Sequence, residues 1–186
     1  MNPFAFLLPL VSVFVGLAVT DVAKSLHVLL RARRRVQWDA LPLAAAFLAV
    51  LTTYNLWWRL VGTADPAVLL TLGGFLLLAA QMLVLYLLNA AALPDDVPAE
   101  GLDLRAFYDA NGPYFWTLFA VHVAVLMATR AVLFPAPGAA VVVQNVAALA
   151  LFAGLAVVRR RSVHAVALAV LSVLAVVGWS GLSLTR

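Results

Sequence analysis

The chain has 186 residues, of which 66% are hydrophobic and 11% are charged, and its mean hydropathy is +1.06. A soluble domain cannot hide that much apolar surface, so the composition excludes an ordinary soluble fold. The sequence contains no cysteine, which excludes disulfides and thiolate metal sites, and its net charge of +4 bears mainly on membrane orientation.

Apolar segments that are each long enough to span a bilayer follow one another along the chain. They predict an all-α, polytopic integral membrane helical bundle, a single transmembrane domain over residues 1–186 with about six transmembrane helices. The first apolar run lacks a basic n-region and an evident cleavage site, so we expect a retained helix and not a signal peptide. Pro66 and Pro113 suit first-turn positions. The predicted helices cover residues 4–30, 40–61, 66–93, 113–134, 138–158 and 163–184.

Arginine-rich segments follow the first and the fifth predicted helices, at residues 31–35 and 159–161. Both segments fall on the same side of a six-span bundle, and short basic loops stay in the cytoplasm. We therefore expect both termini to be external and the connecting loops on the basic side to be cytoplasmic. These cytoplasmic loops are residues 31–39, 94–112 and 159–162.

The longest predicted connection, the cytoplasmic loop 94–112, is acidic. One interpretation is a solvated linker, which is the usual role of a charged loop. The alternative is a short interfacial helix from Asp103 to Ala110 with an apolar stripe of Leu104, Phe107 and Tyr108. In that case the acids of the loop could lie against the two arginine segments.

Polar and small residues recur at every third or fourth position of the first helix and share one face. They are Ser12, Gly16, Thr20, Lys24 and His27, with Asp21 beside them. The first three predict a helix-packing surface of small residues. The lower three, Asp21, Lys24 and His27, predict the lining of a polar pathway, because ionisable groups within spans usually face a cavity or a partner. The alternative is that Asp21 pairs with Lys24 while Lys24 and His27 reach the headgroups.

Further polar side chains lie within the second, third and fourth predicted spans. They are Asn55, Gln81, Asn89, His122 and Arg130, and Gln144 and Asn145 enter the fifth span. Together with Asp21 they could mark a discontinuous polar pathway through helices 1–4. They could also be interhelical hydrogen bonds that hold the bundle together, each worth about 0.6 to 2 kcal/mol.

Several chemistries lack their sequence signals. There is no HExxH motif, no P-loop, no glycine-rich turn and no intramembrane pair of acids with metal-ligand spacing. A haem held by His27 and His164 stays open, although the neighbouring arginines favour a headgroup location for His164. A lipid-modifying enzyme with Asp21 and His27 as its acid and base also stays open. The sequence favours a protein that is not an enzyme, with no cofactor, no metal and no nucleic-acid partner.

The stretches "SLHVLLRARRRVQWDALPL", "LNAAALPDDVPAEGLDLRAFY" and "PYFWTLF" resemble a family of small hydrophobic bacterial membrane proteins to which no activity is assigned. The resemblance covers most of the first four predicted helices and fades after about Phe134. It implies a helical bundle in a bacterial inner (plasma) membrane. It carries over no cofactor and no catalytic residue.

Two functions follow from these patterns. The first is a channel or transporter for an ion or small solute, with a polar pathway lined by helices 1–4. The alternative is a non-conducting membrane scaffold or accessory subunit that binds a membrane or cytoplasmic protein partner. The small-residue faces, which include Ala147, Ala150 and Gly154 of the fifth helix, also predict a homo-oligomer in the lipid bilayer.

Overall fold

The computed structural model describes residues 4–63, 71–133 and 138–180. Within these ranges the chain forms an all-α bundle, and six of its helices are long and apolar enough to cross a membrane. The predicted class, an integral membrane helical bundle, is confirmed. The helices are α1 (Phe4–Arg31), α2 (Ala40–Thr63), α4 (Leu72–Ala90), α5 (Leu104–Leu133), α6 (Ala139–Val157) and α7 (Arg161–Ser180). The predicted helix start at Pro66 and the last residues of the sixth predicted helix lie outside the described residues.

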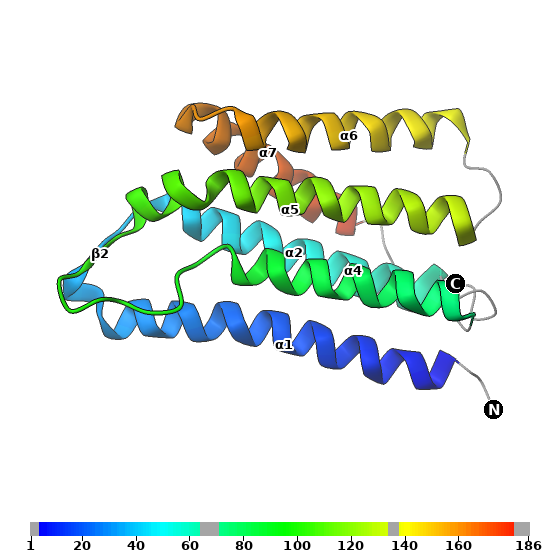
Figure 1. The fold of residues 1–186 in the computed structure, drawn as a ribbon, viewed down its shortest axis with the longest axis horizontal. Helices are drawn as coiled ribbons and strands as arrows, with labels where there is room; N and C mark the ends of the chain where they lie inside the picture. Colours follow the sequence, from blue (N-terminus) through cyan, green and yellow to red (C-terminus); the bar gives the residue numbers. More distant parts are fainter. Residues whose placement is uncertain (1–3, 64–70, 134–137, 181–186) are drawn as a thin grey trace.

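The helices run side by side along the long axis of the molecule (Figure 1). α1 packs on α4 and α2, α4 packs on α5, and the last two helices are peripheral, with α6 on α5 and α7 on α2. Arg33–Arg35 and Arg159–Arg161 lie at the same end of the bundle, which we name the arginine end. We name the other end, at which α2 and α5 finish, the opposite end.

The helix α5 begins at Leu104 and not at Pro113, so the predicted interfacial helix and the fourth predicted span are one continuous helix. The Asp103 carboxylate caps it by accepting the backbone N–H groups of Arg105 at 2.7 Å and Ala106 at 3.2 Å. Pro113 therefore lies inside a helix, where it removes one backbone donor. The cap and the apolar face of the first turns outweigh this loss, and the connection between α4 and α5 is shorter than predicted.

A small parallel ladder closes the arginine end. The turn Arg33–Arg35 leads into β1 (Val36–Gln37), which pairs with β2 (Leu102–Asp103). Gly101 precedes β2 with φ of +104°, and a Cβ at this position would lie 2.8 Å from the Arg35 carbonyl oxygen. Only glycine fits this close approach without strain. The sequence does not predict the ladder, because two-residue strands leave no periodic pattern.

The core lies mainly between α1, α2, α4 and α5. Phe115 and Trp116 of α5 pack there with Leu29 of α1 and with Leu85 and Leu88 of α4. The outward-facing residues of α6 and α7 are largely alanine, valine and leucine. Such a surface is compatible with lipid, which is as apolar as these side chains.

Candidate functional site

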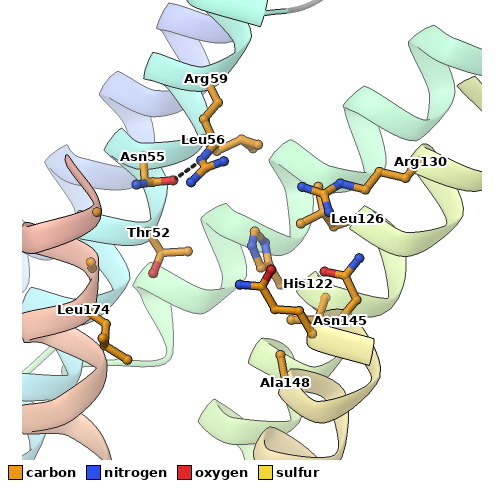
Figure 2. A pocket seen from close by; sticks show the side chains of 14 residues that line it. Thr52, Asn55, Leu56, Arg59, His122, Leu126, Arg130, Asn145, Ala148 and Leu174 are labelled. Atoms are coloured by element: carbon orange, nitrogen blue, oxygen red, sulfur yellow. Dashed lines mark hydrogen bonds between the residues drawn. The ribbon is translucent and has the colours of Figure 1, made fainter. Parts of the chain in front are cut away.

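A pocket of about 440 Å³ opens between α2, α5, α6 and α7 near the opposite end (Figure 2). Seven of its lining residues are polar or charged, and none of the described lining residues is an aspartate or a glutamate. The polar set is Thr52, Asn55, Arg59, His122, Arg130, Gln144 and Asn145. A polar cavity among spanning helices is the strongest candidate for a functional site.

Helical spacing places the charged and amide side chains on the two main walls. On α2, Asn55 and Arg59 are four residues apart, and Arg59 Nε donates to Asn55 Oδ1 at 2.8 Å. On α5, His122 and Arg130 are two turns apart on one face. At about 1.5 Å per residue the pocket therefore extends about 12 Å along α5, from Arg130 to His122. Figure 2 shows Arg59 and Arg130 on opposite walls.

A hydrogen bond between α4 and α5 holds the imidazole at the inner end of the pocket. The Gln81 side-chain nitrogen Nε2 lies 2.5 Å from His122 Nδ1, and the two side chains are only 3% and 8% exposed. With Nε2 of Gln81 as the donor, Nδ1 is the acceptor, and the neutral ring carries its proton on Nε2. Gln81 Oε1 has no hydrogen-bond partner among the described residues.

An aromatic cluster lies beyond His122, toward the arginine end. Phe119 and Phe152 stack with ring centroids 4.9 Å apart, and Trp116 stacks on Phe152 at 6.0 Å. Trp116 also meets the His164 ring edge-on at 5.7 Å. These buried rings pack between α5, α6 and the start of α7, on the side of His122 that faces the arginine end.

A second pocket of about 250 Å³ lies on the far side of this cluster, at the arginine end. It is lined by Tyr108 and Asp109 of α5 and by Arg161 and His164 of α7. The Arg161 guanidinium donates to Asp39 Oδ2 at 2.5 Å and to Asp109 Oδ1 at 2.6 Å. The expectation that acids of the 94–112 segment lie against the arginines is confirmed for Asp109. Asp39 is a second partner, which no pattern in the sequence indicates.

The expected headgroup location of His164 is wrong. The side chain is 5% exposed, and its Nε2 lies 2.7 Å from the Val158 carbonyl oxygen and 3.1 Å from that of Leu155. Both contacts are with acceptors at the end of α6, where carbonyls have no partner inside the helix. His27, by contrast, is exposed on α1. The structure therefore does not bring these two histidines together as a haem-ligand pair.

The polar residues of α1 are not part of the pocket. Asp21 is half-buried, while Lys24 and His27 are exposed, and none of them lines the cavity. α1 contacts α4 and α2 along one edge of the bundle, whereas α6 forms the other edge (Figure 1). The pocket lies between the second, fourth, fifth and sixth spans, so it contains only part of the polar track expected through helices 1–4, and a role of Asp21 in a pathway stays a prediction.

The predicted small-residue packing face of α1 is exposed in the single chain. Trp57 Nε1 of α2 donates to Ser12 Oγ at 3.2 Å, which is a contact at the edge of this face. Thr20 is exposed, and a Cβ at Gly16 would meet no described atom within 4 Å. Packing of this face against another molecule stays a prediction.

Asn89 has a role in packing. Its Nδ2 donates to Thr53 Oγ1 of α2 at 2.8 Å and to the Leu85 carbonyl oxygen at 2.8 Å. These contacts match the interpretation of buried amides as interhelical hydrogen bonds. Of the polar residues predicted in the second to fourth spans, Asn55, His122 and Arg130 thus line one pocket, Gln81 supports it, and Asn89 joins α4 to α2.

Comparison with protein-family models, with curated proteins and with solved structures found no match to this chain. The resemblance to small bacterial inner-membrane proteins therefore stays a prediction.

Proposed function

We propose that this membrane protein is a channel or transporter for an ion or small solute, and that the pocket between α2, α5, α6 and α7 is its binding site. The observation that carries this proposal is the gathering of Arg59, Arg130 and His122 around a cavity among spanning helices. Charged and polar groups are expensive inside a membrane, and they usually face a pathway or a binding cavity.

A route along α5 connects the elements of this proposal. The larger pocket reaches inward from Arg130 to His122, and the smaller pocket begins at Tyr108 near the other end of the same helix. Along α5, Trp116 and Phe119 lie between the residues that line the two pockets, and both stack on Phe152 of α6. In this proposal the stack is the closed barrier of the route, since hydrophobic constrictions can stop conduction by excluding water.

The proposed orientation puts the arginine end in the cytoplasm of a bacterial inner membrane and the larger pocket toward the outside. It is supported by the basic residues in the short connections at that end. Single cysteines at the exposed positions Gln37 and Ala139 would report the orientation in this cysteine-free chain. We expect a membrane-impermeant thiol reagent to label the Ala139→Cys protein from outside and the Gln37→Cys protein only after lysis. The reverse pattern would reverse the proposed orientation.

The direct test of the function is solute flux in proteoliposomes that contain the purified full chain. We expect passage of an anion, a cation or a small neutral solute above the level of empty liposomes. Phe119→Ala should raise the flux several-fold because it opens the aromatic stack. Phe47→Ala is the matched control, since Phe47 of α2 is exposed on the surface. Wild-type and Phe119→Ala liposomes that pass none of the three solute classes would contradict transport and favour the scaffold function.

A further inference from the structure

We infer that the larger pocket is an oxyanion site, which takes the carboxylate or phosphate group of a small organic acid or of a lipid headgroup. This inference rests on the proposed function in that it names the chemical class bound at the same site. It is carried by the hydrogen-bond donors that Arg130, Arg59 and His122 bring to one cavity.

Arg130 supplies a permanent positive charge to the α5 wall. No carboxylate within the described part of the chain lies within 4.0 Å of its guanidinium, whereas Arg161 at the arginine end has two such partners. A guanidinium cannot lose its proton inside a protein and offers a planar fork of donors. That fork matches the geometry of carboxylate and phosphate oxygens.

The α2 wall adds a second guanidinium in a fixed position. The Asn55 carbonyl oxygen accepts the Arg59 Nε proton at 2.8 Å, which orients the arginine along the pocket wall. Because the Asn55 oxygen is used in this way, the amide retains its N–H groups as donors. An orienting partner of this kind reduces the side-chain freedom that binding would otherwise remove.

The inner end of the pocket adds a neutral donor. With Gln81 Nε2 as the donor to His122 Nδ1, the imidazole carries its proton on Nε2, which has no hydrogen-bond partner among the described residues. The side chain is 8% exposed and lines the cavity. Because the ring lines the cavity, an oxygen of a bound ligand would accept this proton.

The charge of the lining selects against other ligand classes. A cation would meet the permanent charge of Arg130, which has no carboxylate partner among the described residues, and a neutral solute would leave that charge unbalanced. The pocket has a volume of about 440 Å³ and extends about 12 Å along α5. These dimensions admit a small organic acid and also the phosphate end of a lipid.

The test measures thermal unfolding of the full chain in phosphate-free maltoside detergent at constant ionic strength. The soluble probes are succinate and inorganic phosphate, with succinamide and choline as the neutral and cationic comparisons. We expect the midpoint to rise with succinate or phosphate and to stay unchanged with the other two. Arg130→Gln should weaken the binding about ten- to hundredfold, because it removes a charge-assisted pair. Arg160→Gln at the arginine end is the matched control and should bind as the wild type does.

Nanodiscs distinguish the two sources of the oxyanion. If a soluble acid is the ligand, succinate binds with equal affinity in detergent and in nanodiscs that contain phosphatidylglycerol. If a lipid headgroup is the ligand, phosphatidylglycerol stabilises the protein and weakens succinate binding, and Arg130→Gln removes both effects. Either result supports an oxyanion site. Stabilisation by choline, no shift with any anion or lipid, or an equal shift in the Arg130→Gln protein would overturn it.

The binding and flux experiments test the oxyanion site and the transport function independently. Anion binding in a protein that passes no solute would contradict transport and leave the oxyanion site intact. Passage of rubidium together with no anion binding would contradict the oxyanion site and leave transport intact.

Discussion

The two ends of the bundle contain arginines in different chemical surroundings. At the arginine end, Arg161 contacts two carboxylates that belong to α5 and to the residue before α2. At the opposite end, Arg59 and Arg130 line a cavity whose described lining contains amides and an imidazole but no acid. The first arrangement balances charge within the protein and joins helices. The second leaves Arg130 facing a cavity without a carboxylate partner among the described residues, which is the arrangement expected of a ligand site.

We expect a substitution in the aromatic cluster between the two ends to cause the largest loss of stability. Trp116 is completely buried and contacts the rings of Phe115, Phe119, Phe152 and His164. Trp116→Ala should lower the free energy of unfolding by about 3 to 5 kcal/mol, because it leaves a large cavity. Chemical denaturation in mixed micelles would measure the change. Trp38→Ala, at a side chain that is 44% exposed, should cost far less. Equal losses in both variants would contradict the role of the cluster as the packed barrier.

We expect Arg161 to contribute more than Arg130 to the free energy of unfolding, and Arg130 to contribute more than Arg161 to anion binding. Arg161→Gln should cost about 1 to 3 kcal/mol, because it removes charged hydrogen bonds from Asp39 and Asp109. This loss is smaller than for a fully buried pair, because the Arg161 side chain is 24% exposed and solvent screens its charge. Arg130→Gln should change stability by less than about 0.5 kcal/mol while it weakens anion binding. A larger stability loss in Arg130→Gln than in Arg161→Gln would contradict the assignment of Arg161 to helix joining and of Arg130 to ligand binding.

A smaller stability change should distinguish Thr53 of α2, which packs against α4, from its neighbour Thr52, which lines the pocket. Thr53 accepts a hydrogen bond from Asn89, so Thr53→Val should cost about 0.6 to 2 kcal/mol. Thr52 is its neighbour and donates within its own helix to the Leu48 carbonyl oxygen, so Thr52→Val should be close to neutral. Both differences are measured in the same denaturation assay. The assignment of Asn89 to packing fails if the Asn89→Leu, Thr53→Val double variant loses the sum of the two single changes, as for independent sites.

The smallest effect is expected at Asp21. Because Asp21 lies on α1 and does not line the pocket, Asp21→Asn should leave succinate binding and solute flux unchanged. The polar face of α1 predicts a pathway role for Asp21, so this variant distinguishes a pathway that includes α1 from a route along α5. Loss of flux in a protein that folds normally and still binds succinate would show that the route includes α1.

Local patterns in the sequence were sufficient for the membrane class and for most helix positions. The apolar runs that predict helices over 4–30, 40–61 and 138–158 correspond to α1, α2 and α6 with small differences at their ends. Each run needs only its own hydrophobicity and length to form a spanning helix. The predicted start of the fourth span at Pro113 is wrong, because the Asp103 cap begins α5 at Leu104 and Pro113 lies inside the helix.

The sequence by itself determined that the chain forms a membrane bundle, that its polar groups occupy particular spans, and that the arginine segments share one end. Those properties depend on composition and on the direction in which successive helices run. Only the tertiary structure decided that Asn55, His122 and Arg130 face one pocket while Asp21 does not. The reason is that helical periodicity fixes which residues share a face, but the packing of one helix against another fixes which faces meet.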